Sequence, residues 1–453
     1  MIKLKKMHEP LKLKRAGFLF LVMLLPMVTS AQSKLTDNTL RVDYTFSGSA
    51  KECRIYLDEL STFTGWAGRT VNMDHVHLFG NGAIRMTDAE TGDVLYCNSF
   101  STLFQEWQQT EEATKASKSF ENIFLLPMPS VPVKITVELF DTYNSVVSSL
   151  THDVDPKDIL IRRIGQNPPY YRYLHHSGKA SDCIDVVILP EGYTADEMDI
   201  FYSDAQAAVE SILLHEPFRT LGDRFNFMAV RLPSEESGVS IPKQGIWKST
   251  ALGSHFDTFY TDRYLTTLRI RQMHDQLAGI PYEHIIILAN TDNYGGGGIF
   301  NSYTLTAAHH PSEPQVVVHE FGHSFGGLAD EYYYDDQYEN YYNPETEPWE
   351  QNITTQVDFD SKWKDMIESG TPVPTPNPAP NPRAVRTKAE RTAVSKLPAV
   401  GLFEGGGYMS KGVWRGSFNC RMHTNECPEF CPVCQRALER IIHYYTEDDH
   451  ISN

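Results

Sequence analysis

Two histidines and a glutamate in one short segment are the residues best able to do chemistry in this sequence. His319 and His323 lie four residues apart in VVVHEFGHSFGGLADEYYY, residues 316–334, and Glu320 directly follows the first of them. On an α-helix this spacing is about 40° more than one full turn, so both imidazoles share one face. Two such nitrogens suit zinc, and the carboxylate beside them can accept a proton from water. The pattern predicts a hydrolytic zinc site.

The residues after this helix supply candidates for a third ligand, which a zinc hydrolase needs together with one open coordination position. Gly326 and Gly327 are predicted to end the helix, because glycine enters the left-handed conformation at low cost. The reversed chain can then bring a carboxylate back to the metal. Asp330 is the predicted third ligand, and the adjacent Glu331 is the reserve candidate. The alternative is a helix that merely buries two histidines beside its valines; the glycines, the acids and an export signal favour the zinc site.

The beginning of the chain predicts export. Lysines and arginines precede an apolar run at residues 16–28, and Thr29-Ser30-Ala31 follows it, so residues 1–31 are predicted to be a secretory signal peptide. No later segment approaches the roughly eighteen apolar residues of a membrane span. The remaining chain of this 453-residue sequence is long enough for roughly two or three domains. We expect a protein that is secreted, periplasmic or held at the cell surface.

The charge of the chain restricts its partners. A formal net charge of -18 argues against nucleic acid or an anionic membrane as the binding partner. A protein or glycoprotein substrate is the partner that a zinc hydrolase would need. The oligomeric state has no signature in the sequence.

The periodicity of apolar residues predicts a multidomain chain. In residues 32–160, alternation such as Leu40, Val42, Tyr44 and Phe46 indicates half-buried strands and an all-β sandwich. From residue 165 to 453, strand and helix patterns alternate, which indicates an α/β domain. The expected elements of this domain are a strand at 183–189, a helix at 195–215, strands at 225–232, 285–288 and 303–307, and a terminal helix at 433–444. The glycine run at 293–298 and the proline-rich tract at 371–399 are predicted to be flexible loops.

The chain contains seven cysteines, four of which lie close together near the C-terminus: Cys420, Cys427, Cys431 and Cys434. In an exported chain these four favour two disulfides, and their pairing cannot be read from sequence. A four-cysteine zinc site is the alternative, because Cys431 and Cys434 have the CxxC spacing of such sites. Cys53 and Cys97 are candidates for a further disulfide.

Several motifs resemble the IgA-peptidase family of secreted bacterial zinc metalloendopeptidases. HEFGHSFGGLADEY, YMSKGVWRGSFNCRM and CPEFCPVCQRA follow in that order, and DVVILPEGYTADEM resembles the start of the family's catalytic domain. The resemblance spans roughly residues 165 to 445. It implies a metzincin-like domain after a β-rich one, with zinc held by His319, His323 and an acid in place of a third histidine. In metzincins the third ligand lies six residues beyond the second histidine; that position is Ala329, so a ligand at Asp330 implies a loop one residue longer.

The resemblance also implies supporting residues. Metzincin-like sites have a methionine in a tight turn beneath the metal, and Met422 matches it better than Met409. Tyr408, or Tyr332, is a candidate donor of a hydrogen bond to the oxyanion formed during attack. The strand at 303–307 is expected to bind substrate at the sheet edge, so Thr304→Pro is expected to weaken substrate binding and leave the metal in place.

The predicted function is a secreted zinc-dependent endopeptidase that hydrolyses peptide bonds through a metal-activated water. One alternative is a non-catalytic surface-binding protein in which zinc is structural, and Glu320 argues against it because a structural site has no need of that carboxylate. The other alternative is a zinc amidase acting on peptidoglycan or glycopeptides. Only the substrate separates an amidase from an endopeptidase.

Overall fold

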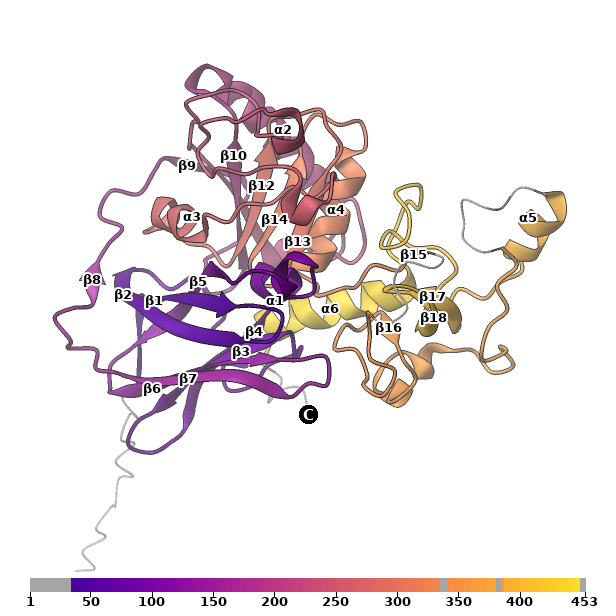
Figure 1. Cartoon of the computed structure of the whole chain (residues 1–453), viewed down its shortest axis with the longest axis horizontal. Coiled ribbons are helices and arrows are strands. Elements are labelled where there is room, and N and C mark those ends of the chain that lie inside the picture. The colour runs from indigo at the N-terminus through magenta and orange to yellow at the C-terminus, as the bar shows by residue number, and fades with distance from the viewer. Residues whose placement is uncertain (1–33, 335–340, 380–384, 386, 449–453) are drawn as a thin grey trace, which may run out of the picture. The chain divides into compact units, whose positions relative to one another are not determined.

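Alternating apolar residues build two four-stranded sheets in the first part of the chain (Figure 1). The structure is a computed structural model that describes residues 34–334, 341–379, 385 and 387–448, so the predicted signal peptide at 1–31 lies outside the described residues and stays a prediction. The first sheet contains, in spatial order, β5 (Lys118–Pro129), β1 (Leu35–Gly48), β2 (Cys53–Thr64) and β8 (Arg162–Arg163). The second contains β4 (Val94–Phe100), β3 (Gly82–Asp88), β6 (Val133–Phe140) and β7 (Val146–Val154).

Aromatic side chains join the two sheets face to face. The ring centroids of Phe46 in β1 and Phe100 in β4 are 6.2 Å apart, and those of Phe100 and Phe124 in β5 are 4.5 Å apart. These distances are those of packed aromatic pairs. A short helix, α1 (Leu103–Gln108), follows β4 and begins at Thr102, whose side chain accepts a hydrogen bond from a first-turn amide. The first part of the chain is therefore a pair of sheets with a shared apolar core.

A six-stranded sheet forms the centre of the second part of the chain. In spatial order it contains β13 (Gly296–Ile299), β14 (Tyr303–Ala307), β12 (His284–Ala289), β10 (Ile184–Glu191), β11 (Phe225–Val230) and β9 (Tyr171–His175). The four inner strands are parallel to one another, and the two outer strands, β13 and β9, are antiparallel to the strands that they pair with. Every residue of β10, β11 and β12 is buried, as expected for parallel strands that are covered on both faces.

Successive residues of β10 enter two different cores. Ile184, Val186 and Ile188 pack with the apolar faces of α2 (Met198–Leu213), α4 (Glu313–Ser324) and α6 (Pro432–Thr446). Val187 and Leu189 point the other way, into a core that includes α3 (Ile270–Leu277) and both N-terminal sheets. An ion pair of 2.6 Å between Arg41 and Asp275 joins the same surfaces. The core of the N-terminal sheets thus continues to the six-stranded sheet.

A small sheet and a short helix complete the described structure. The sheet contains β15 (Tyr333–Tyr334), β18 (Tyr408–Arg415) and β16 (Ile353–Thr354), with β17 (Phe403–Gly406) also paired to β18. The tract at 371–399, predicted as a flexible loop, contains α5 (Lys388–Val394), which begins with a capping box between Thr387 and Glu390. Residues 380–384 and 386 of this tract lie outside the described residues.

Two expectations for the region before α4 are wrong. The glycine run at 293–298 was expected to be a loop, but its second half, residues 296–298, belongs to β13, which pairs with β14. The strand at 303–307 forms as β14, yet it lies between β12 and β13 and presents no free edge. A substrate therefore cannot add to β14 as an extra strand, and Thr304→Pro does not test substrate binding.

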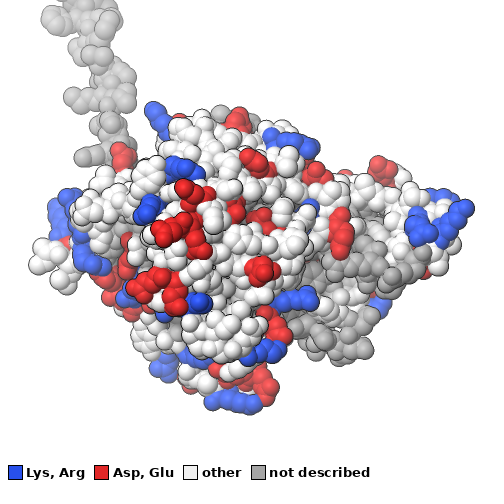
Figure 2. All heavy atoms as spheres, turned by 90° about the horizontal axis from the view of Figure 1, so that it is seen from above, with Lys and Arg blue, Asp and Glu red and all other residues white. Residues whose placement is uncertain are grey.

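The surface carries charges of both signs. Acidic and basic side chains are interspersed on the face that Figure 2 shows, and the whole sequence has 58 acidic against 40 basic residues. None of the helices in the described part of the chain has the length and apolar character that a membrane crossing requires.

Candidate metal centre

The helix α4 places the two histidines on one side and the hydrophobic core on the other. Val317, Val318 and Phe321 are buried in the core shared with α2 and α6. The helix ends where Gly327 adopts a φ of +57°, a left-handed conformation that favours glycine, and the Gly327 amide donates to the carbonyl of His323 at 2.9 Å. The predicted glycine stop is confirmed, and the chain turns back toward the histidines.

Three ligand atoms converge beside α4. The Nε2 atoms of His319 and His323 are 3.1 Å apart, and Asp330 Oδ1 lies 3.0 Å from the first and 3.3 Å from the second. Ligands about 2.0 Å from one tetrahedral zinc ion are separated by about 3.3 Å. The three atoms therefore have the spacing of one face of a zinc coordination sphere. Glu320 lies beside them, with side-chain ligand atoms of His319, Glu320 and His323 within 4.8 Å of one another.

Backbone carbonyls orient both imidazoles. His319 Nδ1 lies 3.1 Å from the carbonyl oxygen of Arg421, and His323 Nδ1 lies 2.5 Å from that of Leu328. A carbonyl only accepts, so each Nδ1 carries a proton, and the two Nε2 atoms are left to face the common point and share a cation there. Two lone pairs and a carboxylate that face one another repel unless a cation lies between them. The site fits a divalent metal for this reason.

Asp330 is held as an anion. It is 5% exposed, and among the described residues Oδ1 has no hydrogen-bond donor, while Tyr408 donates its hydroxyl to Oδ2. Burial disfavours the carboxylate, but the histidines opposite it lower the pKa of Asp330 well below its usual range. Burial also disfavours the charged form of His323, but Asp330 opposes this effect and the pKa of His323 rises to about 9, so Nε2 carries a proton unless a metal ion takes its place. Burial raises the pKa of Glu320.

Met422, for which the resemblance implied a place beneath the metal, packs against α4. It is fully buried, and its Sδ would be only 2.9 Å from a Cβ atom added at Gly322, so the sulfur packs on the helix between the two histidines. Its carbonyl accepts a hydrogen bond of 2.8 Å from the amide of Glu331, next to the third candidate ligand. Met409, the alternative, belongs to a separate small cluster with Ala329. The Met422 turn thus contacts both the helix and the ligand loop.

Glu331, the reserve ligand, points away from the histidines. Its Oε1 accepts from Asn352 at 3.1 Å and lies 3.0 Å from the Cys434 sulfur. Asn352 is fully buried, and it also bonds the amide and carbonyl of Ala329, each at 2.8 Å. These contacts fix the loop so that Asp330, and not Glu331, completes the group of three ligand atoms.

Glycines let the sheet approach α4 closely. A Cβ atom at Gly298 would lie 2.3 Å from the carbonyl oxygen of Glu320 and 2.8 Å from His323 Cβ. One at Gly296 would lie 3.1 Å from Glu320 Oε1. No larger side chain fits at Gly298 without moving the helix, so the glycine run serves packing against the candidate metal centre.

A cleft of about 1520 Å³ opens onto the site, and the N-terminal sheets contribute to its wall. Glu106 of α1 lines it and accepts a hydrogen bond of 2.5 Å from the Tyr264 hydroxyl. Burial raises the pKa of Glu106 to about 7. Tyr332 and Tyr341 also line the cleft. Neither Glu106 nor Asn352 was predicted, because each lies far from the histidine motif in sequence and carries no motif of its own.

Comparison with models of protein families gives two matches. Residues 173–396 and 383–442 match the model described as IgA Peptidase M64, and residues 32–151 match the one described as Peptidase M64 N-terminus. A search of curated proteins found no match. The first match covers α4, Asp330 and the Met422 turn, and the second covers most of the two N-terminal sheets. The chain therefore belongs to the IgA peptidase M64 family, with the N-terminal domain of that family preceding its peptidase domain.

Proposed function

We propose that this peptidase is an exported, zinc-dependent endopeptidase with a metzincin-like catalytic domain. The observation that carries the proposal is the convergence of His319 Nε2, His323 Nε2 and Asp330 Oδ1 at 3.0 to 3.3 Å, with Glu320 beside them. Export is proposed from the leader at residues 1–31.

His319, His323 and Asp330 would hold the zinc ion, and their oxygen and nitrogen donors match its preferences. When bound, zinc would supply a Lewis acid that makes water more acidic and polarises a carbonyl group. Three protein ligands leave one position of a tetrahedral ion for other molecules, which is the arrangement of catalytic rather than structural zinc sites.

Glu320 is the proposed general base. Its carboxylate accepts a proton from the water that attacks the scissile carbonyl carbon, and it then delivers that proton to the leaving nitrogen. Burial raises its pKa, which makes it a stronger proton acceptor than an exposed glutamate. The carbonyls of Arg421 and Leu328 keep the two imidazoles in one tautomer throughout.

The substrate is proposed to be an extended polypeptide lying in the cleft beside the candidate metal centre. Glu106, Tyr264, Tyr332 and Tyr341 are among the residues that line this cleft. A protein or glycoprotein chain fits a cleft of this size with aromatic and polar walls better than a small molecule does.

Both alternative functions predict a different outcome. A surface-binding protein with structural zinc has no use for Glu320, and membership of a peptidase family disfavours it. A zinc amidase would use the same residues on peptidoglycan or a glycopeptide. Digestion of a peptide library in parallel with peptidoglycan separates the amidase from the endopeptidase.

The test compares the mature protein with its Glu320→Gln variant on denatured protein substrates, with zinc measured in both. We expect the variant to keep its zinc and to lose about 10²- to 10⁴-fold in kcat/KM, the usual contribution of a general base. The matched control is Glu439→Gln, which removes a half-exposed carboxylate on α6 and is expected to retain full activity. Equal cleavage by wild type and Glu320→Gln would contradict the proposal.

A further inference from the structure

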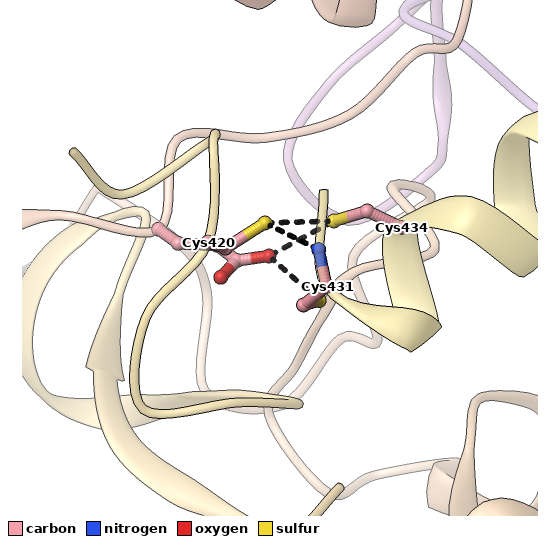
Figure 3. A group of neighbouring side chains, drawn as sticks. Cys420, Cys431 and Cys434 are labelled. Atoms are coloured by element: carbon pink, nitrogen blue, oxygen red, sulfur yellow. Dashed lines mark hydrogen bonds between the residues drawn. The ribbon is translucent and has the colours of Figure 1, made fainter. Parts of the chain in front are cut away.

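Three cysteines and a glutamate form a second cluster of ligand atoms, outside the candidate metal centre. Cys420, Cys431 and Cys434 direct their sulfurs toward one another at the start of α6 (Figure 3). With Glu331, their ligand atoms all lie within 4.8 Å of one another, and all four residues are buried. Cys427, the fourth member of the sequence cluster, is not among them and donates to the carbonyl of Glu429.

The distances match a closed tetrahedral site. Zinc binds thiolate sulfur at about 2.3 Å and carboxylate oxygen at about 2.0 Å, so sulfurs around one ion lie about 3.8 Å apart and sulfur and oxygen about 3.5 Å apart. The Cys420 and Cys434 sulfurs are 3.7 Å apart. Glu331 Oε1 lies 3.0 Å from the Cys434 sulfur and 3.9 Å from that of Cys431.

Hydrogen-bond donors, the start of a helix and a buried arginine lie around the sulfurs and can offset the negative charge of metal-bound thiolates. The amides of Cys431 and Met422 donate to the Cys420 sulfur at 3.1 and 3.5 Å. Cys431 is the N-cap of α6 and Cys434 lies in its first turn, where the helix dipole stabilises negative charge. Arg415, which is fully buried, interacts electrostatically with Glu331 and offsets part of the remaining charge.

A disulfide explains the cluster less well than a metal. The seven cysteines, all within the described residues, are free thiols, so the predicted disulfides are absent. A bond between any two of the three sulfurs would leave the third thiol and the fully buried Glu331 carboxylate, whose charge Arg415 offsets only in part. Such burial is costly, whereas a divalent ion accounts for all four residues.

We propose that Cys420, Cys431, Cys434 and Glu331 bind a second zinc ion that is structural. Binding releases the thiol protons to solvent, and the four protein ligands leave no open position for substrate. The soft sulfur donors select zinc over calcium or magnesium. The four-cysteine alternative is replaced by a Cys₃Glu set in which Glu331 stands where Cys427 was expected.

This second ion would stabilise the segments that position the ligands of the first site. Glu331 adjoins Asp330, and Cys420 lies two residues before Met422, whose carbonyl bonds the Glu331 amide. Since Arg421 between them accepts from His319, the ion ties together the third-ligand loop, the Met422 turn and the start of α6. The second zinc site uses different ligand atoms from the first, so each site can be tested without the other.

The test measures zinc in the exported, mature protein and in the His319→Ala/His323→Ala variant, which removes the ligands of the first site. We expect two zinc ions per chain in wild type and one in the variant. X-ray absorption of the zinc in the variant is expected to show a sulfur shell at about 2.3 Å. All seven thiols are expected to react with a thiol reagent after denaturation with a chelator.

Cys434→Ser and Cys427→Ser are the matched pair of cysteine variants. Cys434→Ser is expected to lose one zinc and to melt at a lower temperature, while Cys427→Ser retains both ions. If Cys434→Ser does not fold, X-ray absorption of the His319→Ala/His323→Ala variant still tests the second site through its sulfur shell. The second site would be overturned if that variant showed no sulfur shell. It would also be overturned if two of the seven thiols of wild type failed to react, as a disulfide predicts. A wild-type protein with one zinc in a sulfur shell would instead overturn the proposed function and keep this inference.

Discussion

Tyr408→Phe separates two roles for one hydroxyl group. The sequence suggested Tyr408 as an oxyanion donor, but in the structure its hydroxyl donates to Oδ2 of Asp330. Both side chains are within the wall of the cleft, and the Asp330 carboxylate is buried. We expect the hydroxyl to act mainly by orienting the third ligand.

The size of the effect follows from the charge on Asp330. A hydrogen bond to a charged group contributes about 1.5 to 3 kcal/mol, which is roughly a 10- to 150-fold change in an equilibrium constant. Partners of metal ligands typically change metal affinity by about 10- to 100-fold when removed. If Tyr408 were an oxyanion donor, its removal would instead lower kcat by about 10²- to 10³-fold with the metal in place.

The assay measures the zinc dissociation constant by competition with a chelator, and kcat/KM at saturating zinc. For Tyr408→Phe we expect a dissociation constant about 10- to 100-fold weaker and less than tenfold loss of kcat/KM once zinc is saturating. Tyr143→Phe, at a 61% exposed tyrosine, is the control and is expected to change neither quantity. An unchanged dissociation constant with kcat reduced 100-fold or more would refute the positioning role.

Three further substitutions test the packing and the electrostatics of the fold. Met422→Ala is expected to lower the free energy of unfolding by about 2 to 5 kcal/mol in urea titration, and a change below 1 kcal/mol would contradict its packing against α4. Gly298→Ala is expected to lower both the melting temperature and zinc affinity, because its Cβ would lie 2.3 Å from the Glu320 carbonyl oxygen; unaltered zinc binding would contradict the close approach. Burial raises the pKa of Asp185 to about 7, so its contribution to stability is full below about pH 4 and is lost as pH rises through 7. Urea unfolding at about pH 5 and pH 8 is expected to show a smaller pH dependence for Asp185→Asn, and an equal dependence in both proteins would disprove this assignment.

Local sequence patterns predicted the centre of the candidate site. The spacing of His319 and His323 determines a shared helix face, and Gly327 marks the turn that returns Asp330 to them, so a short segment contains most of the information. The helix predicted at 195–215 also forms, as α2 between Met198 and Leu213. In the same way, the apolar run at 183–189 forms β10.

Features that depend on distant parts of the chain escaped prediction. Glu331 meets the cysteines of residues 420–434 only after folding, so spacing alone suggested Cys427 as the fourth ligand. The glycines of β13 were expected to form a loop because a glycine run usually interrupts regular structure. Their small size instead allows close contact with α4, and that contact is not visible in sequence. Glu106 lines the cleft from the N-terminal domain, and sequence alone does not show that this domain packs beside the site.

The continuous core between the N-terminal sheets and the six-stranded sheet limits how this protein can be divided. Val187 and Leu189 of β10 pack in the core shared with the N-terminal sheets, so a fragment that began at residue 165 would expose apolar side chains to water. Such a fragment is a poor starting point for recombinant truncation, and the N-terminal sheets cannot be exchanged between proteins like a detachable binding module. Loss of either half is expected to cause aggregation of the other, so protease engineering in this chain has to keep both halves together.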